Sequence, residues 1–268
     1  KQAAGHFGIT AYTATISTAC SSAANAIAMG ARLLRQGKLK RVIVGGTDAL
    51  CRFTTNGFNS LMILDSEWCK PFSVNRAGLN LGEAAAYLVL ESKEVAEARG
   101  AEIHGLVTGW ANTNDAFHQT ASSPDGNGAF MAMSQALEKA ELNSSDISYI
   151  NAHGTGTQNN DHSESIAIHR VFGEAKPPIS STKAFTGHTL AAAGAIEAVY
   201  SILALKENKL FPNLNYQDPI EDNDWKPQPG LRLPTATERL IPIGMTAEPG
   251  SGHTLAVNTA DLLITHNR

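Results

Sequence analysis

The sequence has little of several features that define common protein classes. It contains three cysteines, at irregular spacing and without a Cys-x-x-Cys pair, so we expect neither a disulfide framework nor a clustered metal site. No apolar run approaches the roughly 20 residues that span a bilayer, and the first residues lack the apolar stretch of a signal peptide. The formal net charge of −4 provides no positive field for nucleic acid. We therefore expect a cytoplasmic protein that binds neither membranes nor nucleic acid.

Hydrophobic residues make up 43% of the chain, which is enough for a large buried core. Apolar runs typical of strands occupy residues 40–45, 84–91, 103–109, 147–151 and 178–182, with a shorter β-favouring segment at 15–19. Helices are predicted at 21–31, 92–99, 128–140, 163–172 and 190–205. This alternation predicts a layered α/β fold. Loop-rich stretches are predicted between the first two strands and, because of several prolines, after Lys206.

Three short motifs place reactive side chains near predicted strand ends. Cys20 lies in Thr-Ala-Cys-Ser-Ser, where the N-terminus of the following helix would favour a thiolate. His153 lies in Asn-Ala-His-Gly-Thr-Gly-Thr, and His188 ends Ser-Thr-Lys-Ala-Phe-Thr-Gly-His, each after a predicted strand. Reactive groups gather at strand ends in α/β folds, so the three side chains could converge. A lone cysteine is more often part of a core, which is our interpretation of Cys51 and Cys69.

Two other kinds of site fit the sequence less well. A metal site is not expected, because Cys20, His153 and His188 are far apart in the sequence and lack a second ligand at short spacing. A serine hydrolase would need a Gly-x-Ser-x-Gly turn, which is absent.

The three motifs, in this order, resemble the active-site motifs of the β-ketoacyl-[acyl-carrier-protein] synthases of the thiolase superfamily. The similarity runs from about His6 to Tyr216, and residues 56–65 and 77–83 look most like synthases of aryl polyene and related pigment pathways. The resemblance implies a thiolase-like layered αβαβα fold built from two βαβαβαββ halves. Residues 1–100 would end the first half and carry Cys20, and residues 101–268 would form the second half with both histidines. Most of the first half would lie outside this chain, and apolar edges should be exposed.

The activity that the resemblance implies is decarboxylative Claisen condensation in fatty acid or polyketide synthesis. Cys20 would accept an acyl group from an acyl carrier protein. His153 and His188 would then bind the thioester carbonyl of a malonyl extender, promote loss of carbon dioxide and stabilise the enolate. No metal or other cofactor is implied, because the substrates travel on the phosphopantetheine arm of the carrier protein. The implied assembly is a homodimer or a heterodimer with a related subunit.

Supporting roles follow from the same resemblance. Lys183 would lie behind the histidines in a charge network. The expected members of this network are Glu164, Asp115 and Asp161, with Glu197 as a structural carboxylate. The expected substrate contacts are Thr155 and Thr157 to the phosphopantetheine arm, Phe58 to the acyl tunnel, and Gly250 and Gly252 as backbone donors.

The C-terminal part departs from the family pattern, which ends in a loop of the type Asn-Ser-Phe-Gly-Phe-Gly-Gly. Residues 246–254 read Thr-Ala-Glu-Pro-Gly-Ser-Gly-His-Thr and contain no aromatic gate. A non-catalytic, chain-length-type partner subunit or an incomplete fragment therefore stays an alternative. A thiolase acting on coenzyme A esters is a further alternative, but it would normally need a second cysteine near the C-terminus, and none follows Cys69.

Overall fold

Two β-sheets form the framework of the computed structural model, which describes residues 2–118, 121–220, 226–228, 230–231, 242–248 and 258–265. Strands β1 (Arg41–Asp48) and β2 (Ala84–Glu91) pair antiparallel. The second sheet has the strand order β3-β7-β6-β4-β5, in which β4 is parallel to both of its neighbours and β7 is antiparallel to both of its own. Its strands are β3 (Leu106–Asn114), β4 (Tyr149–Asn151), β5 (Ile179–Ser180), β6 (Pro242–Glu248) and β7 (Asn258–Thr265).

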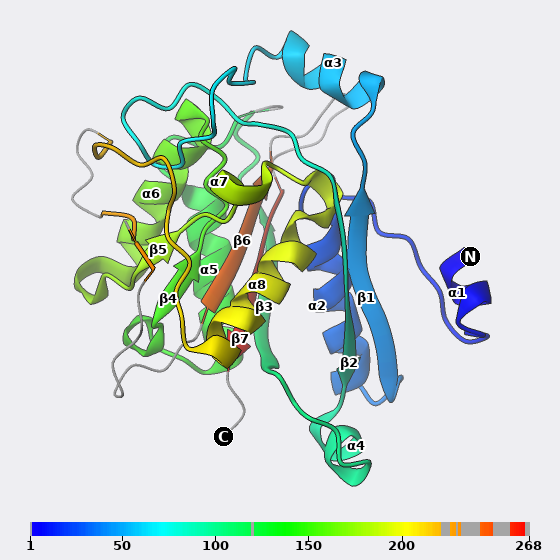
Figure 1. Ribbon diagram of the computed structural model, residues 1–268. Helices are drawn as coiled ribbons and strands as arrows, with labels where there is room; N and C mark the ends of the chain where they lie inside the picture. Colours follow the sequence, from blue (N-terminus) through cyan, green and yellow to red (C-terminus); the bar gives the residue numbers. More distant parts are fainter. Residues whose placement is uncertain are drawn as a thin grey trace.

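Helices lie between the sheets and on one outer side (Figure 1). Helices α2 (Ser22–Arg35) and α8 (Ala193–Glu207) pack between the two sheets, and α5 (Asn127–Ala140) and α6 (Gln158–Phe172) cover the far face of the larger sheet. The resulting order of sheet, helices, sheet and helices confirms the predicted layered α/β fold. The shorter helices are α1 (Gln2–His6), α3 (Arg52–Ser60), α4 (Lys93–Ala98) and α7 (Lys183–Thr186), with 3₁₀ turns at Ser144–Asp146, Gly173–Ala175 and Leu190–Ala192.

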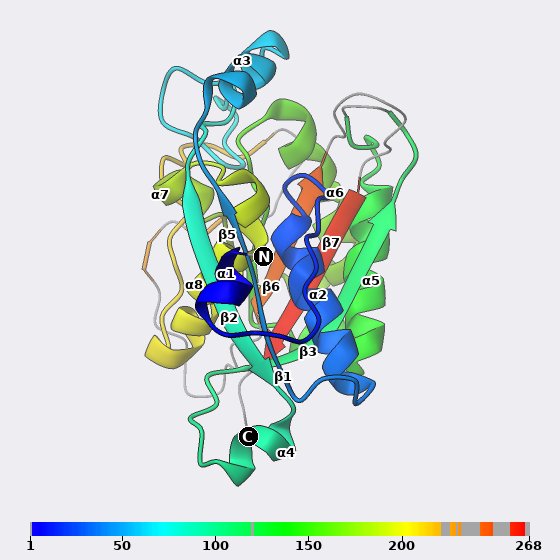
Figure 2. The ribbon, with the colours of Figure 1, turned by 90° about the vertical axis from the view of Figure 1, so that its right-hand side faces the viewer.

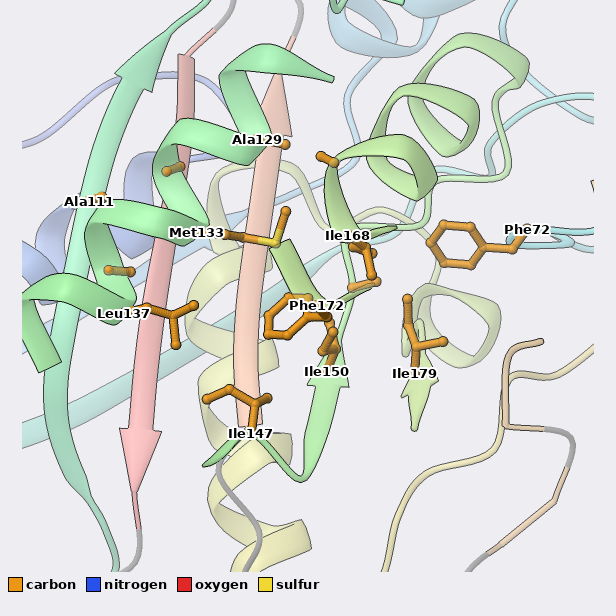
Figure 3. Packing of buried hydrophobic residues seen from close by; sticks show 14 of the residues in the cluster. Phe72, Ala111, Ala129, Met133, Leu137, Ile147, Ile150, Ile168, Phe172 and Ile179 are labelled. Carbon is orange, nitrogen blue, oxygen red and sulfur yellow. The ribbon is translucent and has the colours of Figure 1, made fainter. Parts of the chain in front are cut away.

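The main core lies between the larger sheet and helices α5 and α6 (Figure 3). The buried residues of α5 recur at the spacing of one helical face. Met133 and Leu137 of that face belong to the same buried cluster as Ile150 of β4 and Phe172 of α6. Burial of such a side chain contributes about 1.5–3 kcal/mol relative to exposure. Helix α5 also lies very close to β3, because a Cβ added at Gly109 would be 2.1 Å from the carbonyl oxygen of Ala136.

Helices α2 and α8, strand β1 and the turn before α8 meet through glycine and alanine residues. We call these residues the small-residue seam (Ala23, Ala24, Gly46, Ala191 and Gly194). A Cβ added at Gly194 of α8 would lie 2.8 Å from the Cβ of Ala24 in α2. A Cβ added at Gly46 of β1 would lie 2.5 Å from the carbonyl oxygen of Ala191 and 2.9 Å from the Cβ of Ala23. The seam therefore brings the first turn of α2 against the start of α8, with no room for one more methyl group.

The outer face of the β1–β2 sheet carries exposed apolar side chains. Ile43 is 40% exposed, Tyr87 55% and Val89 58%, and cross-strand pairing sets Ile43 opposite Val89. Helix α1 lies beyond this side of the molecule but contains no buried residue. The described residues thus form four layers, in agreement with the expectation that part of the layered fold lies outside this chain, and the predicted exposure of apolar surface is confirmed at this sheet.

Several predicted elements differ from the structure. Residues 15–19 form no strand, and only an isolated bridge joins Thr18 to Cys20. Part of the predicted loop-rich stretch is helix α3, and β6 and β7 lie in the region expected to be irregular. The strand predicted at 103–109 begins at Leu106 and extends to Asn114, and the helix predicted at 163–172 begins at Gln158. Among the residues that the structure describes, no helix has the length and apolar character needed to cross a membrane.

Candidate active site

Cys20 lies at a sharp turn directly before α2. The preceding residue, Ala19, has a left-handed φ of +52°, which an alanine adopts at a cost that the surrounding contacts must offset. The Ser21 hydroxyl donates to the Thr18 carbonyl at 2.7 Å, and the Ser22 hydroxyl donates to the Ala19 carbonyl at 2.6 Å. The buried Cys20 side chain consequently lies at the N-terminus of a 14-residue helix, where the helix dipole favours an anion. This position of Cys20 agrees with the prediction from its motif, and the structure adds that the two serine hydroxyls of the motif hold the turn.

His153 follows β4 and is held through its backbone by a carboxylate. The amides of His153 and Gly154 donate to the two carboxylate oxygens of Glu164 at 2.7 and 2.8 Å. Burial raises the pKa of Glu164 to about 7, although these hydrogen bonds act in the opposite direction. The imidazole is buried, and within the described part of the chain its Nδ1 has no hydrogen-bond partner. Glu164 therefore fixes the loop, while the ring itself stays available for another group.

His188 is held by a short pairing with the segment that precedes β2. Its amide donates to the Asn80 carbonyl at 2.7 Å, and its carbonyl accepts from the Gly82 amide at 2.9 Å. Nδ1 of the ring accepts from the Leu190 amide at 3.3 Å. Since Nδ1 is an acceptor, the neutral ring carries its proton on Nε2. The ring thereby presents a hydrogen-bond donor at Nε2.

The two histidine rings meet edge to face. Their centroids are 5.1 Å apart, and their planes are inclined by 89°. The pKa of each ring lies well below its usual 6.5, mainly because burial disfavours the charged form and also because the Lys183 ammonium is nearby. Both rings are therefore neutral near pH 7, which suits groups that stabilise negative charge as it develops on a carbonyl oxygen.

Lys183 lies at the start of α7 and forms a buried ion pair with Glu197 of α8. The direct ion-pair partner of Lys183 is therefore Glu197, which was expected to be only structural. The Lys183 ammonium also acts to lower the pKa of Glu164, as the expected charge network implies. Burial raises the pKa of Glu197 to about 7, although Lys183 acts to lower it. The two residues are 14 positions apart and meet only because the chain turns between α7 and α8.

The other expected acidic residues support loops instead. The Asp161 carboxylate accepts from the Phe72 amide at 2.8 Å and the Gly156 amide at 3.2 Å, and burial raises its pKa. The Asp115 carboxylate accepts from the Ser123 amide at 2.9 Å and from a neighbouring backbone amide at 3.2 Å. Asp161 therefore fixes the loop that follows His153, whereas Asp115 fixes a separate turn after β3.

The residues expected to contact the substrate lie in different parts of the structure. The Thr155 and Thr157 hydroxyls share a hydrogen bond of 2.9 Å in the loop after His153. Gly156 between them has a φ of +80°, which allows the loop its tight turn. Phe58 is half-buried on α3, a helix without a fully buried residue that projects from one end of the molecule, so this chain gives its tunnel role no support (Figure 2). Gly250 and Gly252 lie outside the described residues.

The small-residue seam brings the segments that follow Cys20 and His188 together. Cys20 precedes Ala23 by three residues, and His188 precedes Ala191 by three residues. Ala23 and Ala191 both contact the position of Gly46, and the Ala191 amide donates to the Asp48 carboxylate at 3.1 Å. The seam therefore connects the segment that carries Cys20 with the segment that carries His188.

Two buried polar residues that sequence reasoning missed connect the site loops. The Asn213 side chain accepts from the Ser181 amide at 2.9 Å and donates to the Pro71 carbonyl at 2.9 Å. The Ser181 hydroxyl donates to the Gly154 carbonyl at 2.9 Å. Asn213 follows a proline in a segment without periodicity, so no sequence signal marked it. Within the described ranges, no group of three or more His, Cys, Asp and Glu side chains could hold a metal ion.

Comparison with known proteins places the layered fold in a family. Residues 2–96 match the family model described as beta-ketoacyl synthase, N-terminal domain, and residues 104–217 match beta-ketoacyl synthase, C-terminal domain. The chain belongs to the β-ketoacyl synthase family.

Similar proteins include 3-oxoacyl-[acyl-carrier-protein] synthase 2 of Staphylococcus aureus, which is 39% identical over 215 residues, covering 77% of this chain and 53% of the relative. The same-named protein of Rhizobium meliloti (strain 1021) is 38% identical over 252 residues, covering 90% of this chain and 59% of the relative. The chain thus spans about half the length of the curated relatives it matches.

Solved structures of ketosynthases are similar along almost the whole chain. One is AntDE:AntF, a type II PKS acyl-carrier protein in complex with its ketosynthase, with a TM-score of 0.92 and 30% identity over 100% of this chain and 66% of that one. Another is the ketosynthase ApeO in complex with its chain length factor ApeC from Xenorhabdus doucetiae, with a TM-score of 0.88 and 35% identity over 99% of this chain and 63% of that one. The fold is therefore thiolase-like.

Proposed function

We propose that this chain carries the catalytic groups of a β-ketoacyl-[acyl-carrier-protein] synthase that extends acyl chains in fatty acid or polyketide synthesis. The observation that carries the proposal is the pair of buried, neutral histidine rings with centroids 5.1 Å apart. The position of Cys20 at a helix N-terminus supports the same function, as does the seam that brings the segments after Cys20 and His188 together.

The first step in this proposal is acyl loading. The Cys20 thiolate attacks the carbonyl carbon of an acyl thioester on a carrier protein, and a new carbon–sulfur bond forms. The bond to the phosphopantetheine sulfur breaks, and that sulfur leaves as a thiolate and takes up a proton. The N-terminus of α2 stabilises the negative charge on Cys20 before the attack.

The second step is condensation with a malonyl thioester. The carbon–carbon bond to the carboxylate breaks, carbon dioxide leaves, and the electron pair forms an enolate whose oxygen is bound by the two rings. His188 donates from Nε2, because its Nδ1 already accepts from the Leu190 amide. The enolate carbon attacks the carbonyl of acyl-Cys20, and the Cys20 thiolate leaves. One preorganised donor of this kind is worth about 10²–10³ in rate.

The partners in this proposal are an acyl carrier protein and a second ketosynthase-type subunit, identical or related. The AntDE:AntF and ApeO–ApeC structures support both kinds of partner. Thr155 and Thr157 lie in the loop next to His153 and would contact the phosphopantetheine arm, and no cofactor is required. The proposed location is the cytoplasm, where thiols such as those of the three cysteines, which form no disulfide, stay reduced.

Intact-protein mass spectrometry after incubation with an acyl-[acyl carrier protein] thioester tests the proposal. The unaltered protein should gain the mass of one acyl group, and Cys20→Ala should gain none. Cys51→Ala is the matched control and should load normally. Cys69 is buried as the sequence analysis expects, but Cys51 is not part of a core and is an exposed thiol at the start of α3. A folded, unaltered protein that gains no mass would refute the proposal and favour the non-catalytic partner subunit.

A further inference from the structure

Asn80 makes hydrogen bonds in two directions from one position. Its backbone carbonyl accepts from the His188 amide at 2.7 Å. Its side-chain oxygen accepts from the Cys69 amide at 2.6 Å, and its side-chain nitrogen donates to the carbonyls of Asp65 at 3.1 Å and Glu67 at 2.9 Å. A single half-buried amide therefore joins the loop of residues 65–69 to the backbone of a proposed catalytic histidine.

The loop that Asn80 holds is attached in turn to the other histidine loop. The Cys69 thiol is buried and donates to the Thr155 carbonyl at 3.2 Å, and the Cys69 carbonyl accepts from the Asn215 side chain at 2.9 Å. Contact is tight there, because a Cβ added at Gly156 would lie 3.0 Å from the Cys69 sulfur. Hydrogen bonds thus lead from His188 through Asn80 and Cys69 to Thr155.

The backbone pairing of His188 with residues 80–82 is as tightly packed as the contact between Gly156 and Cys69. A Cβ added at Gly82 would lie 2.1 Å from the Thr186 carbonyl oxygen, and one added at Gly187 would lie 3.0 Å from the Asn80 carbonyl oxygen. Gly187 also has a φ of +68°, which favours glycine. A shift of Asn80 must therefore be transmitted to the backbone of His188.

We propose that Asn80 is a positioning residue that fixes His188 relative to the Thr155–Thr157 loop through its bonds to the loop of residues 65–69. The inference rests on the proposed function, in which His188 binds the malonyl thioester and this threonine loop binds the arm that carries it. Asn80 contacts neither substrate nor Cys20 in this scheme, so it should serve malonyl decarboxylation and not acyl loading.

Asn80→Asp is the decisive variant because it keeps the size of the side chain. The acceptor for the Cys69 amide remains, but the two donations to the Asp65 and Glu67 carbonyls are replaced by repulsion between oxygens. Asn75→Asp is the matched control, since exposed Asn75 lies on the same segment and donates to the Gln217 side chain at 2.9 Å.

Two half-reactions are measured on the full chain: loading of Cys20 from an acyl carrier protein, and decarboxylation of malonyl carrier protein. Asn80→Asp should lower the decarboxylation rate on the order of 10- to 100-fold, the cost of misplacing a reacting group by about 1 Å, while loading stays within about twofold of the unaltered protein. Asn75→Asp should change neither. Equal loss of both half-reactions would show a general role in folding and would overturn the proposal, as would unchanged decarboxylation.

Amide hydrogen exchange separates failure of this inference from failure of the proposed function. In Asn80→Asp the amides of Cys69 and His188 should exchange about 10-fold faster or more, because the loop of residues 65–69 loses two of its hydrogen bonds to the Asn80 side chain. If the unaltered protein shows neither half-reaction, the proposed function fails by itself. Unchanged exchange at both amides would then overturn the positioning role as well.

Discussion

Replacing Lys183 by methionine should be one of the most destabilising single changes in this protein. The substitution keeps the length of the side chain and removes the ammonium group from a pair in which Lys183 is 3% and Glu197 2% exposed. The second carboxylate oxygen of Glu197 already has no hydrogen-bond partner among the described residues. Breaking such a pair typically costs about 3–5 kcal/mol, which is about a fifth or more of the roughly 5–15 kcal/mol by which a typical domain is stable.

The pH dependence gives this prediction a second part. Burial raises the pKa of Glu197 to about 7 while Lys183 is present, and Lys183 acts to lower it. Without Lys183 the pKa rises further, so the variant retains a proton that the unaltered protein loses above pH 7. A protein that holds a carboxyl with a raised pKa in its folded state becomes less stable as the pH rises. Each pH unit above 7 should therefore increase the difference in unfolding free energy between Lys183→Met and the unaltered protein by at most about 1.4 kcal/mol.

Urea unfolding of Lys183→Met at pH 7 and pH 8.5 measures both parts. Lys93→Met is the control, because Lys93 and Glu97 form an exposed pair, 47% and 56% exposed, with 3.8 Å between the charged atoms. The control should cost about 0.5 kcal/mol or less at both pH values. The reasoning is refuted if Lys183→Met costs no more than the control. A Lys183→Met/Glu197→Met double variant should recover part of the loss, since it leaves no unpaired buried carboxylate.

Three further predictions follow from other parts of the structure. Because the pKa of both histidines lies well below 6.5, malonyl decarboxylation should keep most of its rate at pH 6. A histidine with an ordinary pKa would be only about one quarter neutral at that pH. A decline of the rate centred on pH 6.5 would contradict this prediction. Gly194→Ala should cost about 1–3 kcal/mol in thermal unfolding because it overfills the small-residue seam, whereas Gly57→Ala on α3, with open space around it, should be neutral or stabilising by up to about 1 kcal/mol. Phe172→Ala should cost about 3–5 kcal/mol in urea unfolding because it empties a fully buried position, and a cost below 1 kcal/mol would contradict the packing in Figure 3.

The sequence predicts those elements whose stability is local or whose apolar pattern is strong. Helix α5 and strand β2 lie close to their predicted ranges, because the buried face of α5 recurs at helical spacing and β2 is a short apolar run between polar residues. The segment 15–19 was wrongly predicted as a strand, because β-branched residues form a strand only where a partner strand is present. Strands β6 and β7 lie among prolines and polar residues, and their pairing with β4 and β3 depends on contacts distant in sequence.

In the candidate site, too, local motifs identify some residues, whereas contacts between distant parts of the sequence could not be predicted. The motifs mark Cys20, His153 and His188 directly. The partner of Lys183 could not be found in the same way, because the direction of α8 after α7 decides that Glu197 and not Glu164 meets the ammonium. His188 likewise owes its placement to pairing with residues more than 100 positions earlier, which no local pattern reveals.

The small-residue seam also has a consequence for how the site can vary. Alanine and glycine have no side-chain rotamers, so the spacing between the start of α2 and the start of α8 is determined by backbone contact alone. Neither thermal motion of side chains nor substitution by a larger residue can adjust that spacing gradually. Adaptation to a longer or bulkier acyl group should therefore arise in residues away from the seam, while the spacing between the starts of α2 and α8 stays constant.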